Sequence, residues 1–259
     1  MVRQAREESA TGYYHVMMRG NNREFIYRTT KDKHYFLQLL KEAENIHLAG
    51  YCLMDNHAHL VIKAQLEQLT KAAQKINIKY AMHYNFHNRR VGHVFQNRYR
   101  SEVVNTEPYL MQVLRYIHNN PLRAGVIKKA EDYRWSSYKE YLDKCVIVAN
   151  DQKTFIMNLF SDSIAQFTHF HQLKDNHEYL DTKEEIDQNR TYLAQSLITD
   201  FLQKKGIFEE KQIRNNDDLM EGLILKLLDE TKLSHREIAQ LLKINRNQIH
   251  KIACIKNKG

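Results

Sequence analysis

The chain has 259 residues, of which 42% are hydrophobic, and its formal net charge is +8 at pH 7. This length and composition allow a packed core in one large domain or in two or three small ones. No apolar run is long enough to predict a membrane span, and residues 1–9 lack the apolar core of a secretion signal. The three scattered cysteines argue against a disulfide framework or a thiolate zinc site, so we expect a cytoplasmic protein.

The charge is spread unevenly along the chain. Lys and Arg number 23 against 14 acidic residues in 1–150, 9 against 16 in 151–230, and 7 against 1 in 231–259. Two basic regions are therefore separated by an acidic one. This distribution predicts two separate contacts with a polyanion, of which nucleic acid is the usual example.

The first 105 residues alternate between the apolar periods of strands and helices. Strands are expected at residues 13–19, 50–54, 57–63 and 99–104, and helices at 31–46, capped by Thr30, and at 69–86. Asp55-Asn56 would join the second and third strands as a hairpin. The order β-α-β-β-α-β predicts an α+β fold, the ferredoxin-like antiparallel sheet, which leaves one face for a site.

Two histidines lie one residue apart in the apolar strand that begins at residue 57. Because side chains alternate along a strand, His57 and His59 would project from one face while Ala58, Leu60 and Ile62 face the other. Two imidazoles on one face are suited to a divalent metal ion with open coordination positions. For this pair alone, two hydrogen-bonded core histidines remain the alternative reading.

The stretch from His87 to Arg100 contains four arginines and no acidic residue. Arginines interleaved with Phe95 and Tyr99 would pair with phosphates while the aromatic rings stack on bases, as in proteins that bind single strands. The alternative is a solvated loop. We expect DNA contacts from Arg89, Arg90, Arg98 and Arg100.

A helix is predicted from Glu107, with Thr106 as its N-cap and Pro121 as its end. Its buried stripe would consist of Leu110, Val113, Leu114 and Ile117. Tyr116 and Asn120 are one turn apart and would share the rim of that stripe. Taken alone, the pattern also fits an amphipathic helix with a border tyrosine.

Four segments in order resemble the single-tyrosine, IS200-like transposases of the HUH endonuclease class, and within them the REP-associated tyrosine transposase branch. They are YYHVMMRGN from Tyr13, CLMDNH from Cys52, GHVFQNRY from Gly92 and YIHNNPLRAG from Tyr116. The resemblance covers about half of the chain and implies an HUH nuclease domain at 1–145. It implies that Tyr116 is the nucleophile and that His57, His59 and Asn120 hold Mg²⁺ or Mn²⁺. The substrate it implies is single-stranded DNA beside a hairpin repeat, cleaved through a 5′-phosphotyrosine intermediate.

Beyond residue 145 the sequence is mostly helical in pattern. Residues 146–228 are acidic and carry no motif, so we treat them as a helical connector. Residues 229–259 have the apolar spacing of a helix-turn-helix, with Ser234 and Glu237 as a capping box and Lys243 where such turns often have Gly. Base edges and phosphates of duplex DNA would be contacted by Arg246, Asn247, Gln248 and Lys251. A helical hairpin used for packing is the alternative.

Two other functions compete with this interpretation. Two-histidine phosphoesterases need Ser or Thr two places after each histidine, and none of the 14 histidines has one. A domesticated, non-transposing DNA-binding regulator is the remaining alternative, against which the intact set of site residues argues. The sequence leaves open whether the protein is a monomer or a homodimer.

Overall fold

The computed structural model describes residues 6–174, 177–207 and 216–256. The chain forms two compact units. The first comprises the chain up to Leu173 together with Tyr179–Asp181, and the second comprises Lys174–Glu178 and the chain from Thr182 onward. Across the described residues, no helix is both long enough and apolar enough to cross a membrane.

The first unit is built on an antiparallel sheet of four strands with the spatial order β2-β3-β1-β4 in the described part of the chain. The strands are β1 (Tyr13–Arg19), β2 (His47–Leu53), β3 (His57–Lys63) and β4 (Arg100–Val104). Helix α1 (Thr30–Lys41) follows β1, and α2 (Leu66–His87) follows β3. The expected β-α-β-β-α-β order is therefore confirmed.

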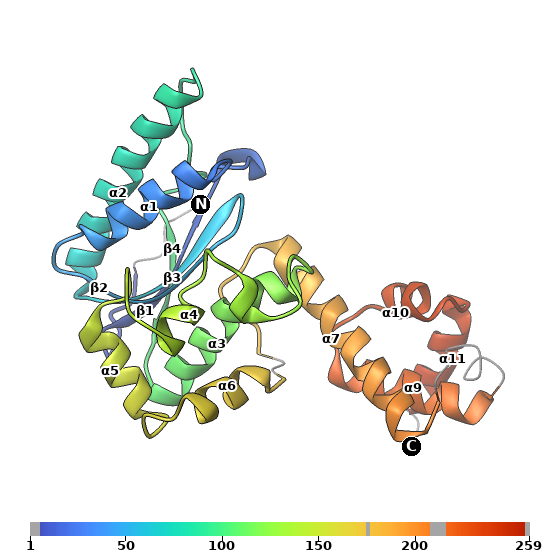
Figure 1. The fold of residues 1–259 in the computed structure, drawn as a ribbon. Helices are drawn as coiled ribbons and strands as arrows, with labels where there is room; N and C mark the ends of the chain where they lie inside the picture. Colours follow the sequence, from blue (N-terminus) through green and yellow to red (C-terminus); the bar gives the residue numbers. More distant parts are fainter. Residues whose placement is uncertain (1–5, 175–176, 208–215, 257–259) are drawn as a thin grey trace. The chain divides into compact units, whose positions relative to one another are not determined.

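The two faces of the sheet carry different side chains. Ala58, Leu60 and Ile62 are fully buried and, because side chains alternate along a strand, lie on the face away from the two histidines. Helices α1 and α2 lie on one side of the sheet (Figure 1). His57 and His59 point to the opposite face, which α3 (Glu107–Arg123) covers. The histidine pair thus faces α3, the helix that carries Tyr116.

Helix α1 is shorter than predicted at its C-terminal end. Its N-cap is Thr29 rather than Thr30, because the Thr29 hydroxyl accepts from the Asp32 N–H at 3.2 Å and the Asp32 carboxylate accepts from the Thr29 N–H at 2.8 Å. The helix ends at Lys41, not at residue 46. Asn45 takes a left-handed conformation, with φ of 59°, and turns the chain into β2.

Helix α3 begins as predicted, because the Thr106 hydroxyl accepts from the Tyr109 N–H at 3.3 Å. The prediction that Pro121 ends it was wrong, since the helix continues to Arg123 with Pro121 in its last turn. A proline lacks only its own N–H, and the next turn is still closed by the Ala124 N–H donating to the Asn120 carbonyl at 2.9 Å.

A glycine lets α3 lie close to the sheet. A Cβ atom at Gly50 in β2 would be 2.5 Å from Leu114 Cδ1 and 3.1 Å from Ile117 Cδ1. The pairing of β2 with β3 shifts register between Leu48 and Gly50 at this point. The missing side chain therefore sets how near the tyrosine helix comes to the strands.

Within the described residues, three further helices complete the first unit: α4 (Tyr138–Leu142), α5 (Asn150–Asn158) and α6 (Ile164–Gln172). Helix α5 packs on β2, and α6 packs on α3. Trp135 is partly buried against the core. Single-turn 3₁₀ helices lie at Asn21–Arg23 and Ala130–Asp132.

The described part of the second unit is helical. It consists of α7 (Lys183–Lys204), α9 (Asp217–Glu230), α10 (His235–Leu242) and α11 (Arg246–Lys256). Leu197, Leu227 and Ile249, from three of these helices, are buried in one core. The capping box of Ser234 and Glu237 is present, and Lys243 adopts the left-handed conformation between α10 and α11 with φ of 55°.

Candidate metal and tyrosine site

The two histidines of β3 are buried side by side. His57 is 4% exposed and His59 is 0% exposed, and their ring centroids lie 5.1 Å apart. In each ring the Nδ1 atom faces a neighbour in the first unit. His57 Nδ1 lies 2.6 Å from Asn56 Oδ1, and His59 Nδ1 lies 3.0 Å from His15 Nε2. With Nδ1 engaged in this way, Nε2 is the atom that each ring would offer to a metal ion.

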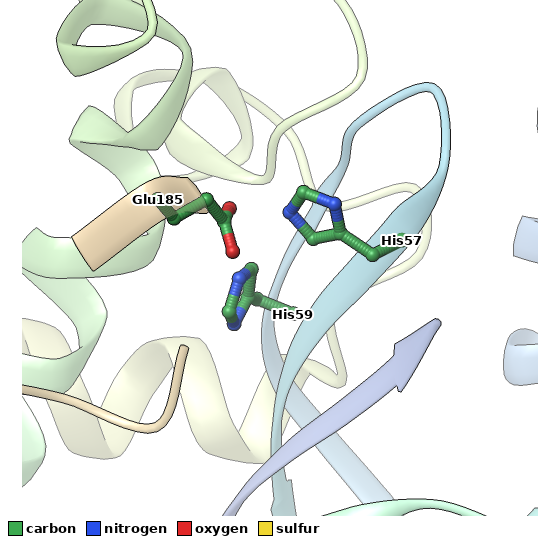
Figure 2. Close-up of side chains that lie close together, drawn as sticks. All are labelled: His57, His59 and Glu185. Atoms are coloured by element: carbon green, nitrogen blue, oxygen red, sulfur yellow. The ribbon is translucent and has the colours of Figure 1, made fainter. Parts of the chain in front are cut away.

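A carboxylate accompanies the two imidazoles. Among the described residues, His57, His59 and Glu185 form a buried group whose potential ligand atoms lie within 4.8 Å of one another. Figure 2 shows the carboxylate of Glu185 facing the two rings. Two imidazole nitrogens and one carboxylate oxygen form a donor set that suits Mn²⁺ well, and Mg²⁺ with added water ligands. The group can therefore bind a divalent metal ion.

Glu185 was not singled out in the sequence. It lies in the first turn of α7, where its carboxylate also accepts from the Thr182 N–H at 3.2 Å as part of a capping box. The only local signal, Thr followed three residues later by Glu, predicts a helix start and says nothing about metal binding.

Tyr116 and Asn120 share one face of α3, as predicted, but that face is not a rim. Their exposed fractions are 1% and 3%. The Tyr116 ring centroid lies 5.7 Å from that of His59 and 5.9 Å from that of His15. The helix face that carries the tyrosine is therefore packed against the histidine face of the sheet.

A short segment that the sequence did not bring to attention lies against Tyr116. The Tyr116 hydroxyl donates a hydrogen bond to the Asp181 carboxylate, and the Tyr179 ring stacks on the Tyr116 ring at 4.3 Å. Asp181 Oδ1 is 3.8 Å from His59 Nε2, and Arg100 Nη1 donates to the Asp181 carbonyl at 2.9 Å. An anion thus already lies beside both the hydroxyl and the histidine.

Behind His59 lies a second polar pair. His15 and Glu102 are cross-strand partners in β1 and β4, and His15 Nδ1 is 3.7 Å from Glu102 Oε2. Glu102 also accepts from the Tyr109 hydroxyl at 2.7 Å and from the Leu180 N–H at 3.3 Å. Burial alone would raise the pKa of Glu102, but the nearby imidazole of His15 and the hydrogen bond from Tyr109 hold it below its usual value.

The arginines of the 87–100 stretch have different surroundings. Arg89 and Arg98 are exposed, and Arg90 forms an ion pair with Glu24. The sequence suggested that the aromatic residues between them would stack on bases. In the structure these rings are packed against the protein instead. Phe95 packs partly buried against the core, and Tyr99 is buried, with its hydroxyl 2.9 Å from that of Thr70. Alternation within the loop could not reveal this because the core is completed by distant segments.

On α11 the four polar residues expected to contact duplex DNA, Arg246, Asn247, Gln248 and Lys251, are all exposed. Ile249 on the same helix is fully buried. The helix therefore presents a basic, amide-bearing surface opposite its core side.

A known protein family matches the part of the chain that carries both histidines and Tyr116. A family profile described as "Transposase IS200 like" matches residues 8–120, which include the sheet, both histidines and Tyr116. Residues 8–120 therefore belong to the IS200-like, single-tyrosine transposase family. A solved REP-associated tyrosine transposase bound to a REP hairpin is 17% identical, with a TM-score of 0.46, over 57% of this chain and 91% of that one. No curated protein matched the chain.

Proposed function

We propose that the first unit cleaves single-stranded DNA and transfers the cut strand, with Tyr116 as the nucleophile. The observation that carries this proposal is the packing of the buried Tyr116 ring against His59, 5.7 Å between ring centroids, in a domain of the IS200-like family. A tyrosine hydroxyl beside a potential metal site is the arrangement that phosphodiester cleavage requires. The REP-associated branch, suggested by the four sequence segments, makes a hairpin-flanked site the expected substrate.

His57 and His59 would hold the ion, Mg²⁺ or Mn²⁺, with Glu185 and Asn120 as candidate oxygen ligands. When bound, the ion would polarise the scissile phosphate. Tyr116 Oη would bond to phosphorus while the bond to the 3′-oxygen breaks. Overall, the tyrosine proton passes to the released 3′-oxygen, leaving a 5′-phosphotyrosine and a free 3′-hydroxyl.

The phosphotyrosine bond keeps the energy of the phosphodiester. Attack by the 3′-hydroxyl of another strand would therefore reverse the reaction and give strand transfer without a nucleotide cofactor. For cleavage to begin, the DNA phosphate has to replace the Asp181 carboxylate next to the Tyr116 hydroxyl. Arg100 and the exposed Arg89 and Arg98 are proposed to contact the DNA backbone, together with Arg90 after release from Glu24.

We also propose that the C-terminal helices bind duplex DNA. The support is a capped α10, a turn at Lys243 and an α11 whose polar residues are exposed. In functional terms the proposal keeps 1–145 as the catalytic domain, 146–228 as a helical connector that also supplies Asp181 and Glu185 to the site, and 229–259 as a helix-turn-helix.

The test is formation of a covalent protein–DNA complex. The purified protein is incubated with a 5′-labelled or 3′-labelled strand that carries the repeats flanking its own gene, with Mn²⁺, and resolved under denaturing conditions. We expect an adduct that retains only the 3′-labelled fragment. Tyr116→Phe keeps the ring and its stacking on Tyr179, so it should bind DNA normally but form no adduct.

Two outcomes contradict the proposal. An adduct at the wild-type level in Tyr116→Phe reassigns the nucleophile, with Tyr109 and Tyr99 as the next candidates. Tight binding of the hairpin strand without any cleavage in Mn²⁺ or Mg²⁺ favours the alternative, a domesticated, non-transposing DNA-binding regulator.

A further inference from the structure

The contacts of His59 raise the question of what fixes the direction in which this ligand points. A histidine binds a metal through an unprotonated nitrogen, so the other nitrogen has to carry the proton. For His57 the acceptor of this proton is local, because Asn56 Oδ1, one residue earlier in the chain, lies 2.6 Å from Nδ1. His59 is fully buried in the middle of the sheet, and its Nδ1 meets another imidazole instead of a carbonyl.

An imidazole can act either as donor or as acceptor, so a contact between two imidazoles does not set its own direction. Nε2 of His15 lies 3.0 Å from His59 Nδ1, and one proton lies between these two atoms. The second nitrogen of His15, Nδ1, determines which of the two rings donates this proton. Its Nδ1 faces the Glu102 carboxylate at 3.7 Å, which is beyond hydrogen-bond length but within the range of charge attraction.

Glu102 is well placed to remain an anion. Its oxygens accept from the Tyr109 hydroxyl at 2.7 Å and from the Leu180 N–H at 3.3 Å. A carboxylate can only accept, so the proton of His15 is drawn to Nδ1, and His15 Nε2 becomes an acceptor. His59 must then carry its proton on Nδ1, which leaves Nε2 with its lone pair directed toward the candidate metal group. With an ion at Nε2 in place of a proton, Nδ1 is the nitrogen of His59 that can donate. Asp181 Oδ1 faces Nε2 at 3.8 Å, which is also beyond hydrogen-bond length.

We propose that Glu102 and His15 are positioning residues that hold His59 in the Nδ1-protonated tautomer and orient its Nε2 for metal binding. The inference rests on the proposed function, because it concerns a ligand of the same metal site. It goes further by assigning a task to two residues on β1 and β4 that are not themselves candidate metal ligands, because His15 reaches the site through His59 and Glu102 acts through His15. Partners of this kind typically change metal affinity by about 10- to 100-fold when they are lost.

The first measurement is the tautomer of His59 in the metal-free protein, read from ¹H–¹⁵N NMR spectra of histidine-labelled protein at pH 8. We expect the Nδ1–H form in the wild-type protein and a mixture, or the Nε2–H form, in His15→Ala. His59 in the Nε2–H form in the wild-type protein overturns the proposal, whatever the activity of the enzyme.

The second measurement is the affinity for Mn²⁺ alone, from the electron paramagnetic resonance signal of the free ion. We expect Kd to rise by about 10- to 100-fold in His15→Ala and to be restored to within about 3-fold of wild type in His15→Gln, whose amide can accept near the position of Nε2. Glu102→Gln removes the charge that sets the direction of the hydrogen bond between His59 and His15, and we expect the affinity for Mn²⁺ to fall by about 10-fold.

Two controls separate this role from a general loss of structure. His118→Gln changes another fully buried histidine, which contacts His171 and Ser137, and it should lower stability without changing the Mn²⁺ affinity. Glu67→Gln removes an exposed carboxylate paired with Lys71 and should change neither. If His15→Ala binds Mn²⁺ as tightly as the wild-type protein does, the positioning role proposed for His15 and Glu102 is wrong. If the wild-type protein binds no Mn²⁺, the proposed metal site itself fails, which is a separate result.

Discussion

At the scale of single residues, the candidate metal site depends on where the protons of two imidazoles lie. His57 and His59 are buried, and each has its Nδ1 atom against a polar neighbour. Metal binding by this pair therefore requires little rearrangement of the rings. Loss of either ring removes a ligand that no nearby histidine of β3 can replace.

We expect His57→Ala and His59→Ala each to lower the rate of adduct formation by at least about 100-fold, because the ion that polarises the phosphate is lost. EDTA should do the same to the wild-type protein, and added Mn²⁺ should restore it. The measurement is the initial rate of adduct formation with the hairpin strand. Undiminished cleavage in EDTA would show that the histidines do not serve a catalytic metal.

A second residue-scale feature is the buried pair His118 and His171. His118 Nδ1 lies 2.9 Å from His171 Nε2, and His118 Nε2 lies 2.7 Å from Ser137 Oγ. Burial lowers the pKa of His118 well below 6.5 and that of His171 to about 4. Both rings are therefore neutral in the folded protein at neutral pH.

This pair predicts a pH dependence of stability. Between about pH 6.5 and pH 4 the unfolded chain binds protons that the folded pair does not, so the free energy of unfolding should fall as the pH drops through this window. His118→Ala should lose about 2–4 kcal/mol at pH 7, because it opens a cavity and removes the ring that contacts His171 Nε2 and Ser137 Oγ, and its pH dependence should be shallower.

Urea unfolding at pH 7 and pH 5 measures both effects. The exposed His93 provides the control, since His93→Ala should leave stability and its pH dependence unchanged. Wild-type stability in His118→Ala would mean that the pair does not support the α3–α6 contact.

At the scale of secondary-structure elements, α3 is the part whose position matters most. It carries Tyr116 and is seated on β2 through Gly50, where an added methyl group would lie 2.5 Å from Leu114 Cδ1. Gly50→Ala should lift the helix away from the strands. We expect a loss of about 1–3 kcal/mol in unfolding free energy, together with a fall in cleavage rate larger than the loss of folded protein explains.

Thermal unfolding and single-turnover cleavage measure the two effects. Gly50→Ala combined with Leu114→Val should recover part of both, because the shorter side chain makes room for the methyl group. Gly222→Ala in α9 is the matched control, since a Cβ there would be at an ordinary 3.7 Å from Phe201. A Gly50→Ala protein with wild-type stability and cleavage would disprove the close seating of α3.

At the scale of the whole molecule, the chain consists of two units with separate cores. Deleting the chain after Asp229 is a poor test of the duplex-binding proposal, because Leu233, Ile238 and Ile249 belong to the core that α7 and α9 share. Substitution of exposed side chains tests the same idea without disturbing that core.

We expect the double variant Arg246→Ala and Lys251→Ala to bind duplex DNA more weakly. The slope of the logarithm of its binding constant against the logarithm of the salt concentration should be smaller in magnitude by roughly 1–2, because two phosphate contacts are lost. Cleavage of the single-stranded substrate should be unchanged. The control is Lys204→Ala with Lys205→Ala, which removes the same charge at two other exposed positions of the second unit. Equal duplex affinities and equal salt slopes for both double variants would make α11 a packing or protein-contact element.

The sequence by itself was sufficient wherever a property depends on neighbouring residues. The alternation from His57 to Ile62 placed both histidines on one strand face, and the spacing of Tyr116 and Asn120 placed them on one helix face. Caps at Thr106 and Ser234 were also predictable, because a capping hydrogen bond spans only three residues.

Only the tertiary structure decided the surroundings of those side chains. Asp181 and Tyr179 lie in an acidic stretch without a motif, yet they contact Tyr116. His15 was part of a matching segment, but its task depends on Glu102, which becomes its neighbour only when β1 pairs with β4. Such contacts join residues far apart in the chain, and they are set by how strands pair and helices pack, which local periodicity does not encode.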